Sequence, residues 1–188
     1  MRRIMLVVCT LALALCAGYA AAQTAPPADT LKVDYFANAN TAGAPDATVR
    51  ITNPGTSGGN LCADIYVFYP DQEMAECCGC ALTPNGLTTL SVNSNLTANP
   101  LTGTLLTSGV IKIVSSVDKG VCNPTSISPT AGLRSWATHI QNSAFTITET
   151  ASQDATLSTA EQARLRNECS AIVLDGSGHG ICSCGTVE

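Results

Sequence analysis

The chain has few of the residues that usually carry catalysis or nucleic-acid binding. Its 188 residues include two histidines, one tryptophan and nine lysines and arginines, and no basic cluster follows Arg2-Arg3. An acidic chain without a basic patch argues against binding to nucleic acid or to anionic membrane surfaces. The sequence contains no glycine-rich phosphate loop after a strand. We therefore expect no catalysis and no cofactor.

A long apolar run occurs only at the N-terminus. Arg2 and Arg3 precede an apolar run over residues 4–16, and Ala20–Ala22 offer the small residues of a cleavage site. This pattern predicts a secretory signal peptide over residues 1–22. A membrane anchor is the alternative, but the run is short for a spanning helix and no second apolar span follows.

Removal of the signal peptide leaves an acidic chain of single-domain size. A short Pro/Ala linker over residues 23–30 comes first. The chain after residue 22 contains seven basic and fourteen acidic residues, so its formal charge is −7. We expect no membrane span after signal removal, and a secreted, periplasmic or cell-surface location. A lipoprotein acylated at Cys16 is a separate alternative, which the bulky Leu15 before it disfavours.

Eight cysteines remain in the mature chain, an even number in an oxidising compartment, so disulfide bonds are the default prediction. They are Cys62, Cys77, Cys78, Cys80, Cys122, Cys169, Cys182 and Cys184. Eight cysteines allow 105 connectivities, and the sequence alone does not choose among them.

The stretch "ECCGC" over residues 76–80 restricts the pairing if it is a strand. Side chains alternate along a strand, so Cys78 and Cys80 share one face and Cys77 lies on the other. A bridge between the adjacent Cys77 and Cys78 would strain the peptide between them. We therefore expect three separate bridges to leave this strand.

Two particular pairings follow from further assumptions. A hairpin over 61–82 with its turn centred on Asp71 places Cys62 opposite Cys80. A bridge from Cys169 to Cys182 or Cys184 would join the C-terminal helix to the tail, and a loop of that length stabilises a fold by about 3 kcal/mol.

A metal site is the main alternative use of these cysteines. Thiolates and an imidazole in C-C-x-C and H-x-x-C-x-C suit zinc or copper(I), although the spacing is not that of a zinc finger. The candidate ligands are Cys77, Cys78, Cys80, His179, Cys182 and Cys184.

Short alternating segments separated by Gly/Pro turns predict a mainly β protein. The predicted strands cover residues 47–53, 61–69, 73–82, 87–93, 109–117, 133–140 and 144–150. Their number and spacing favour an Ig-like or fibronectin-like antiparallel β-sandwich over residues 31–155. Along 61–69, Ala63, Ile65, Val67 and Tyr69 share one face, while Cys62, Asp64, Tyr66 and Phe68 share the other.

One helix is predicted after the sandwich, within a C-terminal segment 156–188 that ends in the Cys-x-Cys tail. Ser158 and Glu161 form a capping box in which each side chain bonds the other's backbone N–H. Gly176 stands at the expected C-terminal cap. The apolar face of this helix consists of Leu165, Cys169, Ile172 and Val173.

Other side chains give further hypotheses. The carboxylates Asp64, Asp71, Glu73 and Glu76 cluster in sequence and would suit a hydrolase, although acidic groups at a hairpin end are usually only solvated. His139 and Glu149 are expected to pair across the last hairpin. Tyr66, Phe68 and Tyr69 are either core residues or a contact surface.

The chain resembles a group of secreted, cysteine-rich bacterial proteins. The resemblance covers most of the mature chain, from "VRITNPG" and "LCADIYVFYPDQEMAECCGCALTPNGLTTLSVN" through "GVIKIV", "LRSWATH" and "TITET" to "GSGHGICSC". It is carried by the Cys-Cys-x-Cys and C-terminal Cys-x-Cys patterns. It implies export and a shared cysteine framework, and it implies no activity, ligand or catalytic residue.

The sequence therefore predicts a secreted, disulfide-stabilised structural or binding module of the cell envelope or extracellular space. Its partner would be a protein or a carbohydrate. Zinc or copper binding is the first alternative, and hydrolysis at carboxylates near 64–76 is the second.

Overall fold

The structure is a computed structural model that describes residues 29–185. The predicted signal peptide and most of the predicted linker lie outside the described residues. The last two linker residues are part of the fold, since Thr30 is buried and Asp29 forms ion pairs with Lys32 and Arg134. Within the described part of the chain, no helix is long and apolar enough to cross a membrane.

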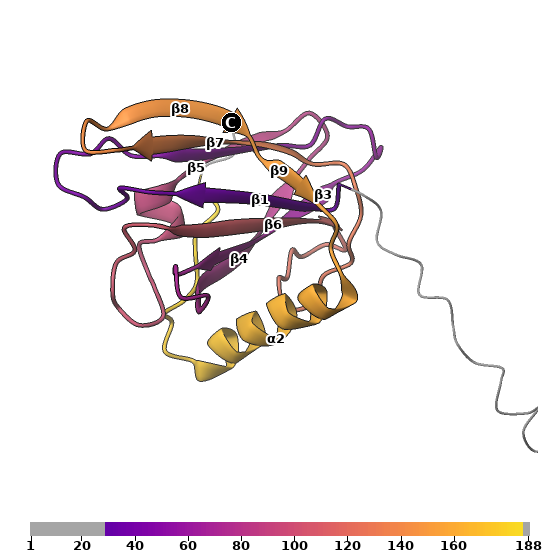
Figure 1. The fold of residues 1–188 in the computed structure, drawn as a ribbon. Coiled ribbons are helices and arrows are strands. Elements are labelled where there is room, and N and C mark those ends of the chain that lie inside the picture. Colours follow the sequence, from indigo (N-terminus) through magenta and orange to yellow (C-terminus); the bar gives the residue numbers. More distant parts are fainter. Residues whose placement is uncertain (1–28, 186–188) are drawn as a thin grey trace, which may run out of the picture.

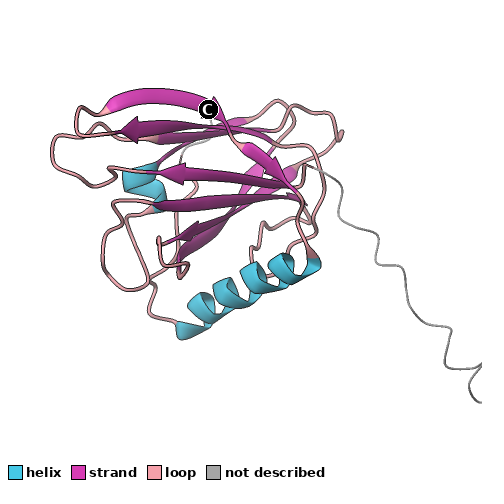
Figure 2. Cartoon of the chain, viewed as in Figure 1, coloured by secondary structure: helices cyan, strands magenta, loops and turns pink. Residues whose placement is uncertain are grey.

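Nine strands form two antiparallel sheets that pack face to face (Figure 1 and Figure 2). Sheet A has the order β4-β3-β6-β1-β9, and sheet B has the order β5-β2-β7-β8. The strands are β1 Leu31–Phe36, β2 Thr48–Thr52, β3 Leu61–Phe68, β4 Met74–Leu82, β5 Leu87–Ser91, β6 Gly109–Val117, β7 Arg134–Gln141, β8 Thr146–Ala151 and β9 Gln153–Ala155. The predicted β-sandwich with one C-terminal helix is confirmed, and the finer Ig-like label stays a prediction.

Two helical segments complete the fold. A single π-helical turn, η1 Val92–Leu96, follows β5, and its N-terminus is capped by the Ser91 hydroxyl, which accepts from Ser94 N. The helix α2 Thr159–Asp175 lies along the face of sheet A that points away from sheet B (Figure 1). The molecule therefore has three layers: sheet B, sheet A and α2.

Helix α2 begins and ends where the sequence predicts. The Ser158 hydroxyl accepts a hydrogen bond from Glu161 N, and Gly176 ends the helix with φ of 68°. The other half of the capping box does not form, because the Glu161 carboxylate pairs with Lys112 at 2.5 Å. Val173 was predicted on the apolar face, but it is 51% exposed because it follows the buried Ile172 around the helix, away from the sheet.

Strand β3 is buried on both faces, as expected of a central strand covered from both sides. Its predicted alternation is confirmed: Ala63, Ile65 and Val67 lie in the core between the sheets, while Tyr66 and Phe68 lie in the core beneath α2. Tyr66 and Phe68 are therefore core residues.

All seven predicted strands are present, with ends that differ by up to two residues, and two strands were missed. The missed strands are β1, which pairs with β6, and β9, which pairs with β1. Only three residues long, β9 gives little periodic signal. The predicted 144–150 strand continues through a bend at Ser152, so that one stretch of chain contributes β8 to sheet B and β9 to sheet A.

Candidate functional site

All eight cysteines among residues 29–185 are paired in four disulfides. The pairs are Cys62–Cys122, Cys77–Cys169, Cys78–Cys182 and Cys80–Cys184, with Cα separations of 5.2–5.9 Å. Three bridges leave β4, as predicted: Cys77 faces the core beneath α2, while Cys78 and Cys80 face the core between the sheets. This one strand is thereby joined to the helix and to the C-terminal tail.

The predicted Cys62–Cys80 pairing is wrong because of a β-bulge. Next to the turn, Phe68 pairs with Met74, which is the register that the sequence suggested. The register then shifts between Val67 and Phe68, so that Cys62 lies opposite Ala81 rather than Cys80. The extra residue also places the two cysteines on opposite faces of sheet A, out of reach of each other.

The predicted bridge from Cys169 to Cys182 or Cys184 is also wrong. Cys169 points from α2 directly onto β4, where Cys77 is the cysteine on the facing side. The tail instead lies along the edge of β4, which brings its two cysteines to the inner-face pair Cys78 and Cys80.

The C-terminal tail covers edges of both sheets. Ile181 forms a parallel bridge with Cys77; Cys77 N donates to Gly180 O at 2.9 Å and Cys182 N donates to Cys77 O at 3.3 Å. On the sheet B side, the Thr88 hydroxyl of β5 donates to Cys184 O at 3.2 Å. An uncovered edge strand is open to pairing with other chains, and the tail removes that exposure at β4.

The metal-ligand set of the sequence does not provide thiolates in this structure. The sulfurs of Cys78, Cys80 and Cys184 lie within 4.8 Å of one another, but each is bonded to another cysteine sulfur. The exposed His179 places Nδ1 2.9 Å from the Asn99 side-chain oxygen. A disulfide sulfur lacks the negative charge that zinc or copper(I) binding needs.

The carboxylates proposed for hydrolysis are not brought together. Asp64 faces the α2 side of sheet A, whereas Glu76 lies opposite Val67 and faces the core between the sheets. Asp71 and Glu73 are exposed at the turn between β3 and β4. The pattern that suggested a paired-carboxylate site therefore distributes its members over two faces and a turn.

Burial changes the acid–base behaviour of two of these groups. Desolvation raises the pKa of Asp64 to about 6, and the neighbouring Ser116 only partly opposes this. Desolvation also raises the pKa of Glu76 to about 7, against the effect of Asn99 N, which donates to Oε1 at 2.9 Å. The second oxygen of Glu76 is buried without a hydrogen-bond partner among the described residues.

The predicted pair of His139 and Glu149 does not form. Glu149 lies opposite Thr138 and forms an ion pair with Arg50 on the outer face of sheet B. His139 is buried; its Nδ1 lies 3.1 Å from Tyr35 O and its Nε2 2.8 Å from the Thr150 hydroxyl. Strand β9 pairs only with residues 31–33 of β1, so it leaves the Tyr35 carbonyl without a partner in β9. His139 bonds that carbonyl, and its role is therefore structural.

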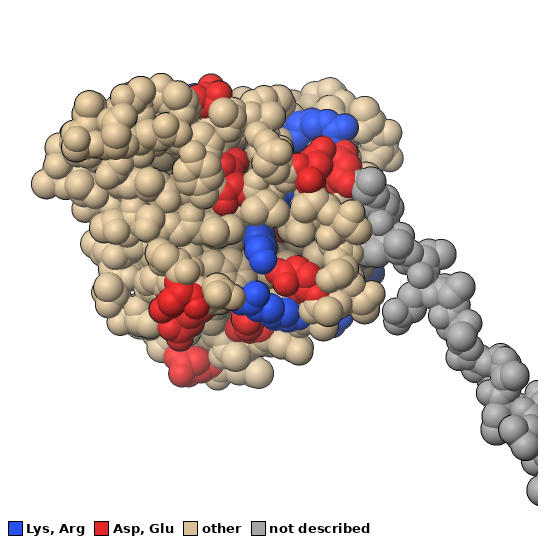
Figure 3. Space-filling view, in the orientation of Figure 1, with Lys and Arg blue, Asp and Glu red and all other residues tan. Residues whose placement is uncertain are grey.

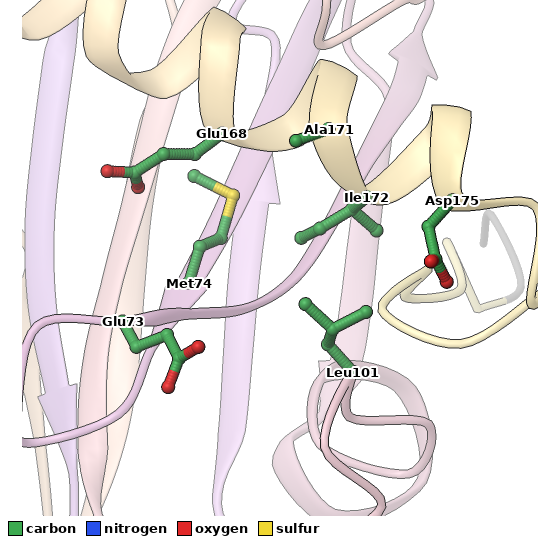
Figure 4. Close-up of a pocket in the computed structure, with 7 residues that line it drawn as sticks. All are labelled: Glu73, Met74, Leu101, Glu168, Ala171, Ile172 and Asp175. Carbon is green, nitrogen blue, oxygen red and sulfur yellow. The ribbon is translucent and has the colours of Figure 1, made fainter.

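A groove between α2 and β4 is the candidate binding site. It has a volume of about 570 Å³ and is lined by Glu73, Met74, Leu101, Glu168, Ala171, Ile172 and Asp175 (Figure 4). Met74, Leu101 and Ile172 belong to or pack against the core beneath α2, so the groove floor lies at the edge of that core. Three carboxylates surround this apolar floor.

The groove walls are fixed in place by nearby covalent and backbone contacts. The Cys77–Cys169 bridge holds α2 over β4, and Leu101 N donates to Ala75 O at 3.0 Å. Gly180 packs so closely that a Cβ on it would lie 2.5 Å from Ile172 Cγ2. A preformed site of this kind loses little conformational entropy when a ligand binds.

The negative charge of the groove is only partly compensated, because Glu168 forms an ion pair with Arg164. One oxygen of Glu168 accepts from Arg164 Nε at 2.8 Å, and the other has no hydrogen-bond partner among the described residues. Glu73 and Asp175 are exposed, and their carboxylates form no ion pair within residues 29–185. Figure 3 shows acidic side chains gathered at the lower left, where Figure 1 places the C-terminal end of α2.

Sequence reasoning found Glu73 but assigned it to a different cluster, and it missed the groove. Glu168 and Asp175 lie seven residues apart, with Ala171 and Ile172 between them, so they share one side of the helix. That spacing was a usable signal. The position of Leu101 could not be predicted, because it lies in a long loop without side-chain periodicity.

The chain is a β-sandwich with four disulfide bonds and one helix that covers one of its sheets. No protein-family model matches the chain, and no curated protein matches it. Among solved structures, the crystal structure of Thermotoga maritima 1070 is similar, with 12% identity, 70% of this chain and 98% of that chain covered, and a TM-score of 0.44. A similarity at that level assigns no function.

Proposed function

We propose that the chain is an exported, disulfide-stabilised binding module of the cell envelope or extracellular space, and that the groove between α2 and β4 is its binding surface. Export is supported by the N-terminal sequence pattern and by four disulfides, which persist in oxidising compartments. The observation that carries the binding role is the groove itself, an apolar floor with polar groups around it.

No catalysis is included in the proposal. Hydrolysis by two carboxylates requires them to flank the reacting bond, and Asp64 and Glu76 are buried on opposite faces of sheet A. Glu73 and Asp175 have exposed carboxylates, and among the described residues no nucleophile or histidine lines the groove with them. Binding is the chemistry that these residues support.

The binding role is tested by selecting ligands from a random peptide library on the oxidised protein that starts at residue 23. Ala171→Trp fills the groove, and Ala163→Trp makes the same change on an exposed position of the same helix. We expect enriched peptides to bind the unmodified protein and Ala163→Trp equally, and Ala171→Trp at least about tenfold more weakly, a difference of about 1.4 kcal/mol. Failure to enrich any ligand, or equal binding to both variants, would contradict a binding role for the groove.

Export is tested separately by expressing the full chain in a bacterium and isolating it from each compartment. We expect a protein in the periplasm or medium that starts near residue 23 and has no free thiol. A full-length chain retained in the cytoplasm with reactive thiols would refute export.

A further inference from the structure

We propose that the groove between α2 and β4 binds a partner polypeptide in which an apolar residue lies between basic residues. This inference rests on the proposed binding function and names the partner class for the same site. It follows from the arrangement of carboxylates around the apolar floor and from the charge at the end of α2. The groove carboxylates also do not converge on one point, as a metal site would require.

The carboxylates lie at both ends of the groove, with apolar side chains between them. In Figure 4, Asp175 lies at one end, Glu73 and Glu168 lie at the other, and Ile172 and Leu101 occupy the middle. A ligand that matches this order carries positive charge at two ends and an apolar group between. A peptide with an apolar residue flanked by lysines or arginines has that order.

The dipole of α2 adds to the preference for positive charge at the Asp175 end of the groove. The C-terminal end of a helix is the negative end of its dipole, where basic residues are usually favourable. The last turn of α2 has no basic residue, and its final residue is Asp175. A cation bound in the groove offsets both charges, and sequences that break such a local rule often do so at functional sites.

A divalent metal ion does not fit this arrangement as well as a peptide does. Calcium needs several oxygens that converge on one point. The carboxylate oxygens of Glu73, Glu168 and Asp175 do not all lie within 4.8 Å of one another, since such clusters in the described residues contain only the cysteines and Asp118. The groove is also open to solvent rather than enclosed, which allows a chain to enter and leave it.

The charge of the whole molecule acts in the same direction. The mature chain carries a formal charge of −7, with fourteen acidic residues and seven basic ones. A basic segment is therefore attracted over a distance of about one Debye length before contact, and added salt weakens that attraction.

Calorimetric titration of the oxidised protein starting at residue 23 with a capped Lys-Lys-Leu-Lys-Lys peptide tests the proposal. The groove variant combines Glu73→Gln, Glu168→Gln and Asp175→Asn. The control variant removes the same charge elsewhere through Asp46→Asn, Asp118→Asn and Glu149→Gln. We expect the groove variant to lose at least about tenfold in affinity and the control variant less than about threefold, with weaker binding of the unmodified protein in added salt.

Four comparison probes decide between ligand classes: the same peptide with Glu for Lys, the same peptide with Ser for Leu, spermidine and calcium chloride. Equal binding of the acidic peptide, or equal loss in both variants, overturns the proposal. Equal binding of the serine peptide would show that the apolar floor has no role, and this result also overturns the proposal. Spermidine or calcium binding in the groove without peptide binding makes it a site for small cations and excludes the polypeptide.

The two proposals fail in different ways. Library peptides that are sensitive to Ala171→Trp but carry no basic residues leave the binding function intact and overturn only the partner class. If no ligand is sensitive to Ala171→Trp, the binding function itself is wrong.

Discussion

Replacing Glu76 by glutamine should make the protein more stable at high pH and should reduce the pH dependence of its stability. Glu76 is fully buried between the sheets, and its pKa is raised from 4.5 to about 7. Between these values the folded chain keeps a proton that the unfolded chain has released, so the free energy of unfolding falls as the pH rises. From pH 5 to pH 8 this one group removes about 2.5 kcal/mol.

Asp64 acts in the same direction. Its pKa is raised from 3.8 to about 6, which removes roughly another 1 kcal/mol over the same range. The combined effect is a protein that is stabilised by mild acid. This is the opposite of the usual behaviour of carboxylates held in ion pairs, which lose stabilisation when they are protonated.

The assay is guanidinium denaturation under non-reducing conditions at pH 5, 6, 7 and 8. A glutamine in place of Glu76 keeps an oxygen that can accept from Asn99 N and carries no charge. Glu76→Gln should therefore match the unmodified protein near pH 5 and exceed it by about 2.5 kcal/mol at pH 8. Glu73→Gln at the exposed turn is the control and should leave the slope unchanged. An unmodified protein that gains stability from pH 5 to pH 8, or a Glu76→Gln variant with an unchanged slope, would refute the assignment.

Three further outcomes follow from the structure. The Cys78–Cys182 bridge already joins β4 to the tail, so Cys77–Cys169 closes only the short additional loop from residue 169 to residue 182. The double substitution Cys77→Ala with Cys169→Ala should therefore lower the free energy of unfolding in denaturant by about 3 kcal/mol. An isolated bridge across 92 residues would contribute more. A loss below about 1 kcal/mol would contradict this loop argument. Gly180→Ala should destabilise by at least about 1 kcal/mol more than Gly178→Ala in thermal unfolding, since both have φ of 79° but only Gly180 packs against neighbours; equal losses would show that the contact with Ile172 is unimportant. Chelators should leave the melting temperature unchanged, because every cysteine of the proposed ligand set is in a disulfide bond. Stoichiometric zinc or copper found by elemental analysis would contradict that.

Much of the fold follows from side-chain period and turn residues. Alternation correctly divided β3 between two cores and β4 between Cys77 on one face and Cys78 and Cys80 on the other. These predictions succeed because a strand has a fixed period of two, which depends on no other part of the chain.

The disulfide partners could not be predicted, because they depend on distances between elements. One extra residue at the bulge after Val67 changes the register of β4 against β3, and nothing in "PDQEMAE" specifies it. The tail has no strand pattern of its own, and its place beside β4 is set by tertiary contacts such as the Cys77–Ile181 bridge. Local sequence therefore determined which face each cysteine occupies and left its partner open.

The groove illustrates a different limit. Its floor joins Leu101, Met74 and Ile172, which are far apart in sequence, so no local pattern could reveal the cavity. Its charge, in contrast, is visible locally: α2 ends in Asp175 with no basic residue in the last turn, against the usual preference of a helix C-terminus. The stability of α2 does not depend on that preference, because packing of Leu165 and Ile172 and the bridge from Cys169 hold the helix on sheet A. A helix fixed in this way can retain an unfavourable charge at its end, and that retained charge is the physical basis for expecting a basic partner there.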